Sequence, residues 1–168
     1  MLSAYIVRMV EGHAETLTKE LVDDLLTNAR TPSLHRLSPD AVRRGAYEVY
    51  RHLGDWLANR SDDNVERTFE AMARRRFQQQ VPLDELVYAV VLTKQHLRQR
   101  LRSVRAVSSA VEIHNEIELD LLIGRFFDKL MYSVVKGYET ARVEASRPQK
   151  VRSKVTLDHK PTKHGWVP

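Results

Sequence analysis

The chain lacks cysteine altogether, and its 168 residues include only six glycines and six prolines. Without thiols there is no disulfide framework, no thiolate-bound zinc or iron–sulfur cluster and no cysteine nucleophile. The glycines are scattered, and none belongs to a glycine-rich loop of the kind that cradles phosphate groups. No apolar run approaches the roughly 20 residues that span a bilayer, and the N-terminus lacks the apolar segment of a signal peptide. We therefore expect a cytoplasmic protein.

Patterns of catalytic residues are missing as well. The sequence contains no His-Glu-x-x-His motif of a metalloprotease and no Gly-x-Ser-x-Gly nucleophile elbow. Serine, histidine and aspartate all occur, but no spacing ties them into a catalytic triad. We therefore expect no catalytic residue, no metal and no cofactor, and we predict that the chain is not an enzyme.

Positive charge is concentrated at the C-terminal end of the chain. The formal net charge is +5, from 27 lysines and arginines against 22 aspartates and glutamates. Residues 1–141 hold 20 basic and 20 acidic side chains, whereas residues 142–168 hold seven basic and two acidic ones. This C-terminal stretch also has three prolines and no apolar periodicity. The pattern predicts a folded domain over residues 1–145 and a flexible basic tail over residues 146–168.

Two basic clusters in the predicted domain raise the alternative of a nucleic-acid-binding protein. They are Arg74–Arg76 and the bases between Lys94 and Arg105. No aromatic residue is interleaved with these charges to stack on a base, and the clusters lie where predicted helices end. Bases at helix ends and acids at helix starts complement the helix dipole, which explains the clusters without a ligand. We therefore do not expect nucleic acid as a partner of the domain.

Helical spacing of apolar residues dominates the predicted domain, and the period-2 alternation typical of strands is nearly absent. Five apolar stripes predict helices over residues 3–29, 39–60, 63–77, 82–104 and 110–145. Ser38 before Pro39 is a strong helix start, because serine caps free N–H groups and proline at the first position loses no hydrogen bond. Asp63 and Glu66 have the spacing of a capping box for the third helix. The pattern predicts an all-α, five-helix fold.

The fifth predicted helix is too long for a compact domain of this size. About 35 residues at a rise of 1.5 Å give roughly 50 Å. Part of the helix must project or be covered by a second subunit, because a projecting apolar helix would be insoluble alone. We therefore expect a homodimer whose interaction surface is formed by Phe127, Leu130, Met131, Val134 and Tyr138.

The histidines admit more than one interpretation. His13 lies on the apolar stripe of the first helix, where a histidine of the core or of an interface would also lie. His13 and His96 are the candidate axial ligands if the domain binds haem. No two histidines of the domain have the i,i+4 spacing that places two imidazoles on one helix face. Any of them could instead titrate near neutral pH and act as a pH sensor.

Several short segments resemble a known family in composition and order. The segments are Thr31-Pro32-Ser33, Leu37-Ser38-Pro39, Asp55-Trp56-Leu57, the run from Val81 to Ala89, and Phe126-Phe127-Asp128-Lys129-Leu130. They make residues 10–140 similar to the N-terminal domain of RsbR/RsbRD proteins, the RsbT co-antagonists of bacterial stressosomes. The same domain also precedes some histidine kinases. The sharpest points are the break at Pro32, Trp56 and the helix start at Pro82.

The resemblance implies a sensory module for signal transduction. In this family the domain is a globin-like helical bundle without haem that forms homodimers, and its exit helices lead to a STAS domain with phosphorylatable threonines or to a kinase. In this sequence the basic tail follows the fifth helix, and its Thr156 and Thr162 stand in no recognisable context. Phosphorylation and RsbT binding are therefore not carried over.

We expect instead a regulatory module that acts by protein–protein interaction. Its expected partners are a second copy of itself and a STAS-domain or kinase signalling protein in trans. A globin-like haem or small-molecule sensor is the alternative function.

Overall fold

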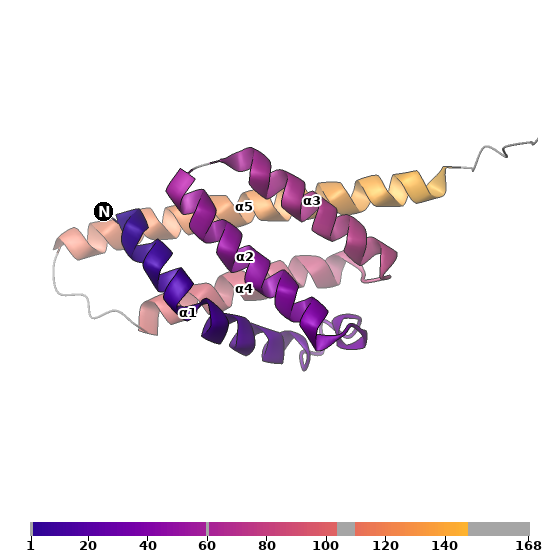
Figure 1. Cartoon of the computed structure of the whole chain (residues 1–168), viewed down its shortest axis with the longest axis horizontal. Helices are drawn as coiled ribbons and strands as arrows, with labels where there is room; N and C mark the ends of the chain where they lie inside the picture. Colours follow the sequence, from indigo (N-terminus) through magenta and orange to yellow (C-terminus); the bar gives the residue numbers. More distant parts are fainter. Residues whose placement is uncertain (1, 60, 104–109, 148–168) are drawn as a thin grey trace, which may run out of the picture.

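The structure, a computed structural model, describes residues 2–59, 61–103 and 110–147 (Figure 1). Its elements are α1 (Leu2–Leu25), the 3-10 turn η1 (Leu34–Arg36), α2 (Pro39–Asn59), α3 (Asp62–Gln78), α4 (Leu83–Ser103) and α5 (Ala110–Ser146). No β-strand occurs in these described ranges, so the predicted all-α fold of five helices is confirmed. Most of the predicted tail, residues 148–168, lies outside them.

The connection between α1 and α2 is built from local side-chain hydrogen bonds. Pro39 is the first residue of α2, and the Ser38 hydroxyl accepts a 3.2 Å hydrogen bond from the Ala41 N–H, which confirms the predicted helix start. α1 ends at Leu25, four residues earlier than predicted. The Thr31 hydroxyl donates a 2.7 Å hydrogen bond to the Leu25 carbonyl, so a side chain takes the place of the next helical N–H.

The start of α3 differs from the prediction. α3 begins at Asp62, so Asp63 already lies inside the helix and the predicted capping box is wrong. The Asp62 carboxylate instead accepts a 2.7 Å hydrogen bond from Trp56 Nε1 and lies 2.7 Å from Lys129 Nζ. Asp62, the first residue of α3, therefore makes tertiary contacts with side chains of α2 and α5 and does not form a local capping box.

The five helices pack around one apolar core. α4 and α5 run side by side along the long axis of the molecule, and α2 crosses them (Figure 1). α3 packs along α5, and α1 packs along α2. The largest fully buried side chains are Tyr50, Phe69, Phe126, Phe127, Leu17, Leu21, Leu53, Leu57, Leu97, Leu119 and Ile123. Phe126 meets both Phe69 and Trp56 through ring contacts, so α2, α3 and α5 share one aromatic centre.

α3 and α5 approach each other most closely at Gly137. A Cβ atom at this position would lie 2.5 Å from the Glu70 carbonyl oxygen, so only glycine fits there. The buried Ser133 and Ala141, one turn before and one turn after Gly137, are also small. Ion pairs flank the contact, with 2.6 Å between Lys136 Nζ and Glu70 Oε1. The C-terminal half of α5 thus packs closely against α3.

Candidate functional site

The predicted interaction surface lies on α5, but most of it faces inward. Phe127, Leu130 and Val134 are buried in the core of the single chain. The expectation that these three side chains form the contact surface with a second copy is therefore corrected, because the chain's own core already covers them.

The other two residues of that predicted surface are half-buried. Met131 packs against the edge of the core. The Tyr138 ring meets the Phe77 ring edge-on, with the two centroids 5.2 Å apart. Burial is also the main reason that the pKa of the Tyr138 hydroxyl lies above its ordinary value. Both side chains therefore have partners within the chain.

The outward face of α5 carries a different set of large apolar side chains. Ile117, Leu121 and Tyr132 are 58%, 60% and 63% exposed. Their spacings of four and eleven residues place them on one side of a helix, since each residue advances by about 100°. Val143, eleven residues beyond Tyr132, continues the row and is also exposed. We call these four residues the α5 outer row.

The sequence contained a signal for the α5 outer row that the apolar pattern obscured. α5 has apolar residues on both its buried and its outward side, so no single stripe stands out along it. The spacing from Leu121 to Tyr132 to Val143 repeats every eleven residues. Only the packing of α3 against the opposite side shows which of the two faces remains free.

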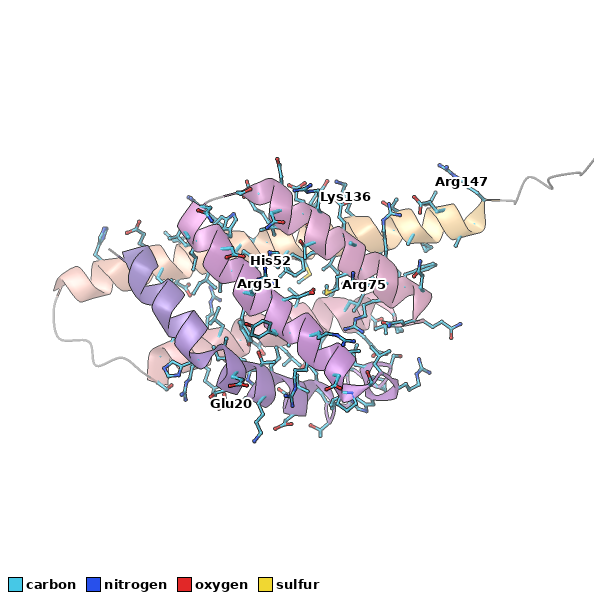
Figure 2. The ribbon with its side chains drawn as sticks, viewed as in Figure 1. Glu20, Arg51, His52, Arg75, Lys136 and Arg147 are labelled. Atoms are coloured by element: carbon cyan, nitrogen blue, oxygen red, sulfur yellow. The ribbon has the colours of Figure 1, made fainter. Side chains whose placement is uncertain are left out.

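The C-terminal end of α5 leaves the bundle. Residues 142–147 are all exposed, and Figure 1 shows this end of α5 extending beyond the other helices. An ion pair of 2.7 Å between Arg74 and Glu144 is the contact with α3 in this part of the helix. Figure 2 shows Lys136 beside α3 and Arg147 at the far end of α5. α5 therefore extends from the packed core to an exposed C-terminal end.

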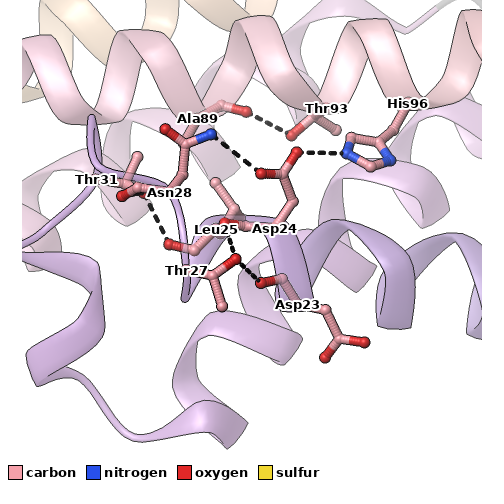
Figure 3. A network of polar contacts seen from close by, with 9 residues as sticks. All are labelled: Asp23, Asp24, Leu25, Thr27, Asn28, Thr31, Ala89, Thr93 and His96. Atoms are coloured by element: carbon pink, nitrogen blue, oxygen red, sulfur yellow. Dashed lines mark hydrogen bonds and ion pairs between the residues drawn. The ribbon is translucent and has the colours of Figure 1, made fainter.

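The two candidate haem ligands lie apart. His96, on α4, places its Nε2 2.9 Å from Asp24 Oδ2 at the end of α1 (Figure 3). This hydrogen bond, with a second one from Asn28, holds the pKa of the Asp24 carboxyl below its ordinary value. His13 is half-buried on α1, eleven residues before Asp24 and so roughly 16 Å away along the helix.

The other polar contacts near His96 lie within α4 or within the end of α1 and its turn. Thr93 bonds back to the Ala89 carbonyl on α4, and Thr27 and Thr31 bond to carbonyls of α1 (Figure 3). Nearby, the buried Glu85 carboxylate accepts hydrogen bonds of 2.8 and 2.7 Å from the backbone N–H and the hydroxyl of Ser33. These bonds fix the turn after α1 onto the start of α4.

A partly open cavity of about 60 Å³ lies among α1, α2, α3 and α4. Its lining is apolar apart from Arg76 and Thr93, and neither His13 nor His96 contributes to it. Arg76 is buried, and its guanidinium donates a 3.0 Å hydrogen bond to the Ala41 carbonyl. Burial lowers the pKa of Arg76. The cavity is far smaller than the roughly 300–1,000 Å³ of ordinary small-molecule sites.

Comparison with known proteins identifies the family. The model of the "RsbT co-antagonist protein rsbRD N-terminal domain" matches residues 15–152, which is most of the chain. The chain belongs to the RsbRD N-terminal family. No curated protein and no solved structure matches the chain significantly. Membership confirms the resemblance carried by the short segments, and it indicates a signalling module of the stressosome type.

The segments that carry the resemblance lie where this RsbRD N-terminal domain turns or packs. Pro32 lies in the turn between α1 and α2, beside Ser33, which bonds to Glu85. Trp56 is buried, as expected of a core residue, and Pro82 directly precedes α4. The three residues thus lie at a turn, in the core and at a helix start, and Trp56 also contacts Phe126 on α5.

The described part of the RsbRD N-terminal domain shows neither a cluster of metal-ligating residues nor a membrane-spanning helix. The described residues include no group of three or more histidines, aspartates or glutamates that could hold a metal ion. None of the described helices is long and apolar enough to cross a membrane. The feature that best suits contact with a partner is therefore the α5 outer row, because it places large exposed apolar side chains along the helix that leaves the core.

Proposed function

We propose that the chain is a non-enzymatic regulatory module of the stressosome type that works in the cytoplasm as a homodimer. The observation that carries this proposal is the α5 outer row, whose large apolar side chains are more than half exposed. Large apolar side chains along one side of an exposed helix suit packing against a second helix. Membership of the RsbRD N-terminal family supports the regulatory role.

In the proposed dimer two copies of α5 pack side by side and parallel, around a twofold axis. Each residue of the α5 outer row then lies opposite its own copy, as twofold symmetry requires. The exposed residues 142–147 of both helices leave the dimer on the same side. A change in the packing of α5 against α3 is then passed to these last turns, since packed interfaces switch between discrete arrangements.

The absence of cysteine from the sequence allows a direct test of this arrangement. A single Tyr132→Cys variant should form a disulfide-linked dimer under mild oxidation, because facing residues bring their Cα atoms within about 4–7 Å. Arg67→Cys, exposed on α3, is the matched control and should stay monomeric on a non-reducing gel. Equal cross-linking of both variants would refute the parallel α5 dimer.

Light scattering tests the dimer without a cross-link. The protein should be dimeric at micromolar concentration, and Leu121→Glu with Tyr132→Glu should make it monomeric, because two carboxylates per chain would be buried without partners. Tyr47→Glu changes another exposed tyrosine, on α2, and should leave the dimer intact. A monomeric parent protein, or a dimer that survives both changes in α5, would contradict the proposal.

The proposed output partner is a STAS-domain or kinase signalling protein that binds in trans. Val143 is exposed near the end of α5, so a photo-cross-linking amino acid there lies within reach of a protein bound to residues 142–147. Mass spectrometry should then identify such a signalling protein besides the second copy. Cross-links to the second copy alone would count against a partner at this end of α5.

The haem-sensor alternative receives less support. Nε2 of His96 is engaged by Asp24, and His13 lies about three helical turns from that contact. Neither histidine lines the cavity of about 60 Å³ among α1 to α4. The regulatory dimer therefore remains the proposed function.

A further inference from the structure

A basic groove lies between α1 and α2, away from α5. It has a volume of about 800 Å³. Its lining comes from two turns of α1 and three turns of α2, and consists of Ala14, Glu15, Thr16, Thr18, Lys19, Arg43, Arg44, Tyr47, Glu48 and Arg51. Four of these side chains are cationic and two are acidic. The groove therefore carries net positive charge although residues 1–141 are neutral as a whole.

The arginines of this α1–α2 groove share one face of α2. Arg44 and Arg51 are seven residues apart, which is two helical turns or about 10 Å along the axis. Tyr47 lies one turn from each of them and is 48% exposed. Arg51 lies near the middle of α2 in Figure 2. Two guanidinium groups and an aromatic ring thus face the same space.

The cations of the groove are not neutralised within the described part of the chain. Among the described residues, no carboxylate lies within ion-pair distance of Arg43, Arg44 or Arg51. The ion pair of Glu48 runs to Arg75 on α3, at 4.0 Å. The four cations of the lining outnumber its two acids, so an anion in the groove would reduce the repulsion between neighbouring positive charges.

From these observations we infer that the α1–α2 groove binds a small molecule with a diphosphate group. Arginine is suited to phosphate because its planar guanidinium donates two parallel hydrogen bonds to phosphate oxygens. The volume falls within the roughly 300–1,000 Å³ of small-molecule sites. The basic face extends only about 10 Å along α2, which is short for a nucleic-acid strand or a helical peptide.

The groove is separate from the surface proposed for dimerisation. A ligand there would contact α1 and α2, whereas the α5 outer row lies on another helix. Binding would therefore hold α1 against α2 and could serve as an input to the module. The inference does not depend on the dimer, and its failure would leave the dimer proposal intact.

Isothermal titration calorimetry with two probes tests the inference. Inorganic pyrophosphate and ADP share the diphosphate group, and ADP adds a ring that Tyr47 could stack against. At about 100 mM salt we expect a dissociation constant below about 1 mM for at least one probe. The Arg44→Gln/Arg51→Gln variant should weaken that binding at least about tenfold, because each arginine supplies charge-assisted hydrogen bonds.

A charge-matched control separates a built site from general attraction. The Arg67→Gln/Arg147→Gln variant also removes two positive charges, but from exposed positions outside the groove, on α3 and at the end of α5. It should keep the parent affinity within about twofold, since exposed distant charges are screened by salt. All four changed side chains are exposed, so both variants should fold like the parent protein.

Three results would overturn the inference as a whole. One is that neither probe binds below about 1 mM. Another is that the control variant loses as much affinity as the groove variant. A third is that the groove arginines are needed for a phosphopeptide or single-stranded nucleic acid but not for either small probe.

Discussion

Gly137→Ala tests the close contact that fastens α5 to α3. The new Cβ atom would lie 2.5, 2.6 and 2.9 Å from the carbonyl oxygen, the Cα and the carbonyl carbon of Glu70. All three are backbone atoms, so no side-chain rotation can relieve the overlap. The two helices must instead separate by several tenths of an ångström or more, and the neighbouring packed residues lose contact.

The expected magnitude follows from two opposing effects. Overpacking a well-filled interior costs about 1–3 kcal/mol, and an overlap with backbone belongs at the upper end. Replacing glycine by alanine inside a helix stabilises it by about 1 kcal/mol. We therefore expect Gly137→Ala to lower the free energy of unfolding by about 2 kcal/mol.

Gly124→Ala, in the same helix, is the matched control. A Cβ atom there would meet nothing within 4 Å, so only the gain in helix propensity remains. This variant should raise the free energy of unfolding by about 0.5–1 kcal/mol. Urea unfolding followed by circular dichroism, at one protein concentration, measures both changes. If Gly137→Ala stabilised the protein as much as Gly124→Ala, the described approach of α3 and α5 would be refuted.

Two further predictions concern the core and the turn after α1. Ser33→Ala should lower the free energy of unfolding by about 1–3 kcal/mol in urea titration, because the buried Glu85 carboxylate loses a hydrogen-bond donor. Ser103→Ala, on the surface, is the control and should change the free energy of unfolding little. Equal effects of the two substitutions would contradict the importance of the Ser33–Glu85 contact. Burial beside Phe69 lowers the pKa of His52, so the unfolded chain takes up a proton first and stability should fall as pH drops from about 7.5 to 5.5. His52→Phe should flatten this part of the pH profile, and an unchanged profile would show that His52 is not its cause.

The sequence by itself determined which elements form and several of their ends. Apolar stripes with helical spacing require amphipathic helices, and Ser38 with Pro39 specifies a helix start through local chemistry alone. The order of the short segments around Pro32 and Trp56 was enough to identify the family resemblance. Local signals of this kind act within a few residues, so one sequence is sufficient to read them.

Only the tertiary structure decided which face of each helix is free. α5 is apolar on both sides, and in the folded bundle Phe127 is buried whereas Tyr132 is exposed. Likewise, the sequence alone does not predict the basic α1–α2 groove, because Arg44 and Arg51 become neighbours of Lys19 only when α1 packs along α2. The spacing of apolar or basic residues shows that a helix has an apolar or a basic side. Which other helix covers that side depends on how closely two backbone segments that are distant in sequence can approach each other.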